Sequence, residues 1–146
     1  MLFRSEADKG LDIVMRWWVD TSFAVHADFK GHSGLALSFG KGAVIDASKK
    51  QRINTRSTTE CELVGVDDAM PKMIWTDLFI TAQGYEPKTT ILHQDNTSTI
   101  SLAVNGKKAS SQRTRHLNIQ YFFVKDQVDQ GWVDRKSTRL NSSHRL

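Results

Sequence analysis

Residues 11–20, LDIVMRWWVD, carry the apolar, β-branched and aromatic side chains that are typical of a strand buried on at least one face. A polar stretch with two glycines follows, and residues 35–39 predict a second strand. Gly40-Lys41-Gly42 is a tight-turn signal, so we expect a third strand to begin near Ala43 and to return as a hairpin. The first part of the chain is therefore predicted to be rich in hairpins.

Predicted helices and strands alternate in the rest of the chain. Residues 57–59 offer N-cap side chains before a helix in which apolar residues recur every three or four positions. Pro71 lies inside this helix and is expected to kink or divide it, and Gly84 is expected to end it. The further expected elements are a strand over 89–94, a short helix over 97–104 and a longer helix over about 114–130. This order predicts an α/β fold in which helices cover a mixed sheet.

The composition is that of one domain with a packed core: 146 residues, 39% hydrophobic and 25% charged. A net charge of +4 favours polyanionic partners only mildly. Cys61 is the single cysteine, which excludes a disulfide framework and a multi-cysteine zinc site and predicts a reducing, intracellular compartment. No apolar run approaches the roughly 18 residues that span a bilayer, so we expect no membrane partner.

Three acidic residues occupy positions that this topology can bring together. Asp20 ends the first predicted strand, Glu62 lies in the first turns of the long helix, and Asp95 follows the strand over 89–94. Carboxylate oxygens suit Mg²⁺ or Mn²⁺, and two such ions promote phosphodiester hydrolysis. Acids at strand ends and helix starts are also commonly solvated or capping groups. Spacing alone leaves both interpretations open.

Four blocks carry a family resemblance: WWVDTSFAVHADFKGHSG (17–34), TRSTTECELVGVDDAM (55–70), ILHQDNTSTISL (91–102) and KKASSQRTRHLNIQYFFVKD (107–126). In this order they resemble the RNase H domain of a copia-type LTR retrotransposon polyprotein, over about residues 6–133. The resemblance implies an RNase H-like fold, with a five-stranded mixed sheet whose first three strands are antiparallel and which is flanked by helices. It also implies cleavage of the RNA strand of an RNA–DNA hybrid with two Mg²⁺ or Mn²⁺ ions. The implied partner is the reverse transcriptase region of the same polyprotein, in a cytoplasmic virus-like particle or the nucleus.

The resemblance assigns the catalytic, metal-binding positions to Asp20, Glu62 and Asp95. Glu60 is not used by the family, so we expect it to have a surface or helix-start role. The family pattern continues past Gly131 with a fifth strand and a helix that carries a fourth aspartate, and both are largely missing here. Asp134 lies too early to be that ligand, so we expect a poorly held second ion and impaired activity.

The resemblance also divides the chain. We expect residues 1–10 to be a linker from the preceding polyprotein region, 11–133 to form the RNase H-like domain, and 134–146 to be a disordered, non-native tail. One alternative function is a catalytically inactive structural or nucleic-acid-binding remnant. A less favoured alternative is an integrase-like nuclease core, which shares the fold but not the continuous match to these blocks.

Candidate nucleic-acid contacts cluster around the loop before the last predicted helix: Lys107, Lys108, Arg113, Arg115 and His116. These side chains either contact hybrid phosphates or form a solvated loop. A weaker basic run, residues 49–56, leads into the Glu62 helix. Asn96 is a candidate contact to a ribose 2′-hydroxyl, with a helix N-cap as the alternative. We expect His93 to be a packed, neutral side chain and the four tryptophans to lie in the core or at its edge.

Overall fold

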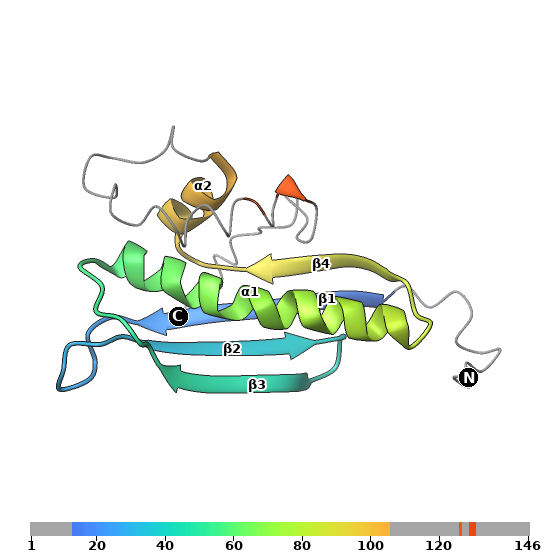
Figure 1. Ribbon diagram of the computed structural model, residues 1–146, viewed down its shortest axis with the longest axis horizontal. Coiled ribbons are helices and arrows are strands. Elements are labelled where there is room, and N and C mark those ends of the chain that lie inside the picture. Colours follow the sequence, from blue (N-terminus) through green and yellow to red (C-terminus); the bar gives the residue numbers. More distant parts are fainter. Residues whose placement is uncertain (1–12, 106–125, 127–128, 131–146) are drawn as a thin grey trace.

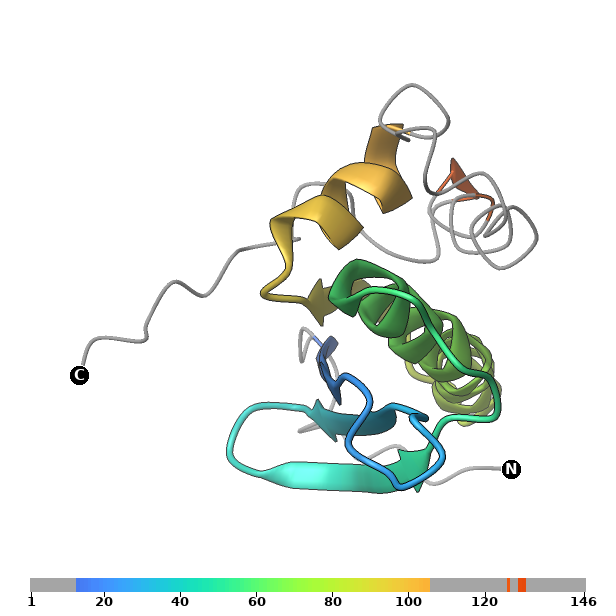
Figure 2. The same ribbon diagram turned by 90° about the vertical axis from the view of Figure 1, so that its left-hand side faces the viewer.

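The computed structural model describes residues 13–105, 126, 129 and 130. Its elements are β1 (Ile13–Ser22), β2 (His32–Ser38), β3 (Ala43–Lys50), α1 (Thr58–Ala82), β4 (Pro87–His93) and α2 (Thr97–Asn105). The strands form one sheet in the order β3-β2-β1-β4. β1, β2 and β3 are antiparallel, as predicted, and β4 pairs in parallel with β1. The long helix α1 lies along one face of the sheet (Figure 1), and the end-on view shows the two layers (Figure 2).

The core lies between α1 and this sheet face. β1 alternates in burial, so that Met15, Trp17 and Val19 face the helix while the residues between them are more exposed. Successive turns of α1 supply Leu63, Val66, Met70 and Met73 to the same core. The two-residue period of the strand and the three- to four-residue period of the helix therefore meet on one apolar surface.

α1 begins with the cap that its sequence predicts. The Ser57 hydroxyl accepts a hydrogen bond from the Glu60 N–H at 3.2 Å, and the Glu60 carboxylate accepts one from the Arg56 N–H. Both bonds satisfy backbone donors near the start of the helix. Glu60 is buried, so its helix-start role is confirmed and its expected surface position is wrong.

Pro71 does not divide α1, which runs as one helix from Thr58 to Ala82. That part of the prediction is wrong because proline removes only one backbone donor, while buried Met70 and Met73 on either side hold the helix against the sheet. Gly84 follows the end of the helix with φ +85°, the left-handed conformation that glycine adopts most readily. The prediction of its position is confirmed.

Several strand boundaries differ from the prediction, and β4 runs from Pro87 to His93 rather than over 89–94. The largest differences arise because pairing extends past the apolar stretches. β1 continues to Ser22, which pairs with His32, and β2 therefore begins three residues before the expected start. Trp17 is buried as expected, whereas Trp75 on α1 is 60% exposed and stacks on Phe79, so the prediction for Trp75 is wrong.

Several predictions fall largely outside the described residues, namely the helix over 114–130, the start of a fifth strand at 131–133, and the segments 1–10 and 134–146. Neither helix in the described part of the chain is long and apolar enough to cross a bilayer.

Candidate metal centre

The sheet topology brings the three predicted carboxylates together. β1 and β4 run in parallel, so their carboxyl ends lie at one edge of the sheet, which is a common location for ligand sites. Asp20 lies near the end of β1, Asp95 lies just beyond β4, and the first turns of α1 place Glu62 beside them. One carboxylate oxygen from each residue lies within 4.8 Å of the other two. Asp20 and Asp95 are exposed and Glu62 is buried, so the cluster opens to solvent on one side.

Glu62 is held in place by a neighbour that the sequence did not single out. The side-chain amide of Gln94 donates a hydrogen bond to Glu62 Oε2 at 3.1 Å, and its carbonyl oxygen accepts one from the Asn96 N–H at 3.0 Å. Burial raises the pKa of Glu62, and the charges of Asp20 and Asp95 raise it further, while the bond from Gln94 opposes the change.

This donor set fits a divalent cation. Three carboxylates supply the hard oxygen ligands that Mg²⁺ and Mn²⁺ prefer. A bound cation would also relieve the mutual repulsion that raises the pKa of Glu62. None of the three carboxylates is the N-cap of α1 or α2, so the capping alternative does not apply, while Asp20 and Asp95 are exposed to solvent.

Asn96 is the N-cap of α2. Its side-chain oxygen accepts a hydrogen bond from the Thr99 N–H at 3.1 Å, and its backbone oxygen accepts one from the Ile100 N–H. The capping interpretation is confirmed, and contact between Asn96 and a ribose stays a prediction. The other candidate nucleic-acid contacts lie outside the described residues: Lys107, Lys108, Arg113, Arg115 and His116.

A hollow of about 150 Å³ adjoins the carboxylates, and its lining includes Asp20, Asp95, Trp18 and His93. The indole of Trp18 stacks on the imidazole of His93, with ring centroids 4.8 Å apart and planes 10° from parallel. Burial, followed by the charge of Arg16, lowers the pKa of His93, which agrees with the predicted neutral side chain. The stacked pair was not predicted, because it depends on the register of β1 against β4.

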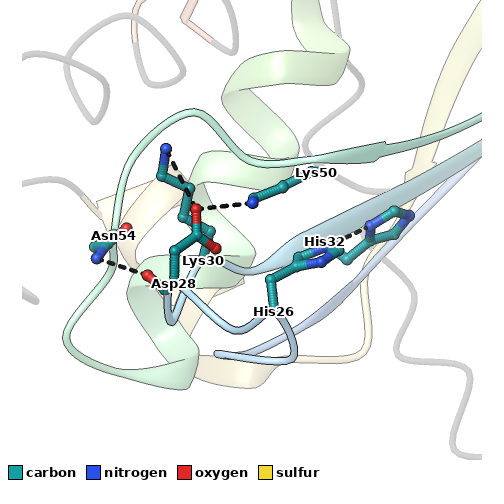
Figure 3. Close-up of polar contacts among 6 residues, drawn as sticks. All are labelled: His26, Asp28, Lys30, His32, Lys50 and Asn54. Atoms are coloured by element: carbon teal, nitrogen blue, oxygen red, sulfur yellow. Dashed lines mark hydrogen bonds and ion pairs between the residues drawn. The ribbon is translucent and has the colours of Figure 1, made fainter.

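The loop after β1 is braced against β3, as Figure 3 shows. His26 Nε2 lies 3.0 Å from His32 Nδ1, and His32 Nε2 lies 2.7 Å from Ser48 Oγ. Lys50 forms an ion pair with Asp28 at 2.7 Å, and the Asn54 amide donates to the Asp28 carbonyl oxygen (Figure 3). These contacts attach the loop that follows β1, the strand that carries Asp20, to β3 and to the segment after β3.

The basic side chains over residues 49–56 lie in two different environments. Lys49 lies 3.5 Å from Asp68 and Lys50 pairs with Asp28, so intramolecular acids offset both lysines. Arg52 and Arg56 are exposed on the connection from β3 to α1. Because β3 and β1 run in the same direction, this connection lies at the same end of the sheet as the carboxylates.

Comparison with known proteins agrees with this geometry. No family model matches the chain. The Retrovirus-related Pol polyprotein from transposon TNT 1-94 of Nicotiana tabacum is 29% identical over 121 residues, which are 82% of this chain and 9% of the relative. The corresponding polyprotein from transposon RE1 of Arabidopsis thaliana is 26% identical over 125 residues, 84% of this chain and 8% of the relative. The chain thus spans less than a tenth of the length of these curated relatives.

Solved structures with a similar fold are RNase H domains. The N-terminal RNase H domain of Rv2228c from Mycobacterium tuberculosis has a TM-score of 0.51 and 9% identity, over 80% of this chain and 76% of that one. LC11-RNase H1, solved in complex with an RNA/DNA hybrid, has a TM-score of 0.52 and 9% identity, over 77% of each chain. The chain is therefore similar in sequence to the retrovirus-related Pol polyproteins of plant transposons, and its fold is that of an RNase H domain.

Proposed function

We propose that this chain is an RNase H-type endonuclease domain that hydrolyses the RNA strand of RNA–DNA hybrids during retrotransposon reverse transcription. The observation that carries the proposal is the cluster of Asp20, Glu62 and Asp95, whose oxygens lie within 4.8 Å of one another at one edge of an RNase H-like sheet. The relationship to transposon polyproteins supplies the biological setting.

Asp20, Glu62 and Asp95 would hold the divalent ions, for which Mg²⁺ and Mn²⁺ are the best candidates. When bound, such ions supply an activated water and stabilise the leaving oxygen of the phosphodiester. The protein contributes the geometry. Asp20 and Asp95 face solvent, where a nucleic-acid backbone can approach, and Gln94 fixes the buried carboxylate of Glu62.

Exposed basic side chains support a nucleic-acid substrate. Arg52 and Arg56 are exposed at the carboxylate end of the sheet, where they can contact nucleic-acid phosphates. A neighbour in fold was solved with an RNA/DNA hybrid, which supports the same substrate here. The expected partner is the reverse transcriptase region of the polyprotein, in a cytoplasmic particle or the nucleus, with a domain extending over residues 11–133.

The decisive test is cleavage of an end-labelled RNA–DNA hybrid in Mg²⁺ and in Mn²⁺. Asp95→Asn keeps the shape of the side chain and removes a ligand charge, so we expect cleavage to fall by at least about 100-fold. Asp46→Asn is the matched control, because Asp46 is an exposed carboxylate on β3 outside the cluster, and we expect its activity to be unchanged.

Two results would contradict the enzymatic proposal. The first is cleavage that survives Asp95→Asn, which would point to a contaminating nuclease. The second is a folded parent chain that binds the hybrid and cuts it in neither ion, which would favour a nucleic-acid-binding remnant. Strand transfer to duplex DNA ends, without hybrid cleavage, would instead support an integrase-like core.

A further inference from the structure

A buried glutamine connects three elements next to the candidate metal centre. Gln51 follows β3 directly and is only 1% exposed. Its side-chain nitrogen donates hydrogen bonds to Ser33 Oγ on β2 and to the Cys61 carbonyl oxygen on α1, both at 2.9 Å. Its side-chain oxygen accepts a bond from the Cys61 thiol, with the sulfur 3.4 Å away. The amide therefore has a partner for both donors and for its acceptor.

Close packing holds this amide in a single position. The Gln51 backbone N–H donates to the Gly31 carbonyl oxygen at 2.9 Å, which brings the end of the β1–β2 loop against the same group. A Cβ atom on Gly31 would lie 2.5 Å from the Cys61 sulfur and 2.6 Å from the Gln51 side-chain oxygen. Only glycine allows this approach, so the backbone at Gly31 packs directly against the Gln51 amide and the Cys61 thiol.

The position of Gln51 bears on the metal centre through the first turns of α1. Cys61 immediately precedes Glu62, and consecutive helical residues point about 100° apart around the axis. Two hydrogen bonds join Gln51 and Cys61, one donated by the Gln51 amide and one by the Cys61 thiol, and together they hold this turn against the sheet. Gln94 then fixes the Glu62 carboxylate from the other side. Glu62 is therefore restrained both at its backbone and at its carboxylate. Metal sites need their ligands to be placed to within about 0.5 Å.

We propose that Gln51 is a positioning residue for the candidate metal centre, which holds Glu62 in its ligating position by binding Cys61. Gln51 has no contact with the substrate or the ions in this role, and it acts only through α1. The inference rests on the proposed function, because it takes Glu62 to be a metal ligand.

The test uses Gln51→Met in the full 146-residue chain. Methionine keeps the length of the side chain and removes all its hydrogen bonds to Ser33 and Cys61. The primary readout is Mn²⁺ affinity, measured by calorimetry without nucleic acid, and we expect about a tenfold loss because residues behind metal ligands have effects of this size. On a hybrid substrate in Mn²⁺, kcat should fall while KM stays within about twofold, since Gln51 does not bind the hybrid.

Met73→Ala is the control for a merely structural effect. Met73 is buried in the far half of the same helix, and its truncation destabilises the core without touching Gln51. At a temperature where both variants remain folded, Met73→Ala should bind Mn²⁺ within about twofold of the parent. Equal losses in Met73→Ala and Gln51→Met would overturn the inference, and so would a folded Gln51→Met chain with parental affinity.

Two further variants keep the outcome decisive. If Gln51→Met does not fold, Gln51→Glu keeps the shape of the side chain and removes the donors to Ser33 and to the Cys61 carbonyl oxygen, and parental Mn²⁺ affinity in that variant would overturn the inference. Glu62→Gln distinguishes a failure of the metal centre from a failure of the positioning role of Gln51. If it leaves Mn²⁺ affinity unchanged, the metal centre itself fails. If it weakens binding while Gln51→Met does not, only the positioning role fails.

Discussion

Asp67→Asn is predicted to stabilise the protein at neutral pH. Asp67 lies on α1, where burial and then the charge of Asp68 raise its pKa from 3.8 to about 6. A raised carboxyl pKa means that the folded chain binds the proton more tightly than the unfolded chain, so ionisation opposes folding increasingly above pH 3.8 and fully above about pH 6. The difference of about 2.2 corresponds to about 3 kcal/mol at ~1.36 kcal/mol for each pKa unit. Because Asp67 is only half-buried and solvent screens its charge, we expect a gain of about 1–2 kcal/mol.

The assay is urea unfolding of the parent and the variant at pH 7.5 and at pH 4.5. Between these values Asp67 takes up its proton in the folded chain, so the gain should fall to about a third at pH 4.5. Asp46→Asn makes the same change at an exposed position and should alter stability by less than about 0.5 kcal/mol. A loss of stability in Asp67→Asn at pH 7.5, or a gain that does not depend on pH, would refute the reasoning.

Three further predictions concern the helix and the carboxylate cluster. Gly65→Ala places a Cβ atom 2.4 Å from Thr21 Cγ2, so thermal unfolding should show a loss of about 1–3 kcal/mol despite the better helix propensity of alanine; an increased Tm would contradict this close approach. Ser57→Ala removes the N-cap of α1 and should cost about 1 kcal/mol in urea unfolding, whereas an unchanged midpoint would mean that the cap is dispensable. Without divalent ions, Asp95→Asn should raise the Tm because it relieves the repulsion among the three carboxylates. Mg²⁺ should raise the Tm of the parent but not of this variant, and an equal response in both would place the ion elsewhere.

Local pattern was enough to predict most of the elements. The hairpin signal before Ala43 and the residues that cap and end α1 all lie close in sequence to the structure they specify. Pro71 shows where such reasoning fails, because its local preference is outweighed by the burial of Met70 and Met73 against the sheet. Likewise, an apolar side chain such as Trp75 does not reveal whether its helix face is covered.

The candidate metal residues were predictable because the ligand chemistry of Asp and Glu can be recognised from residue type alone, and the family resemblance pointed to Asp20, Glu62 and Asp95. Their proximity is a tertiary fact. It depends on the parallel register of β1 and β4, which also pairs Trp18 with His93 across more than seventy residues of chain. Gln51 shows the same limit. An amide is chemically plain in sequence, and only the packing of β2, β3 and α1 around it determines that all its hydrogen bonds are buried beside Glu62. The chemistry of each side chain can thus be read along the chain, but which side chains meet is a property of the fold, because their contacts depend on long-range register and packing rather than on neighbours in sequence.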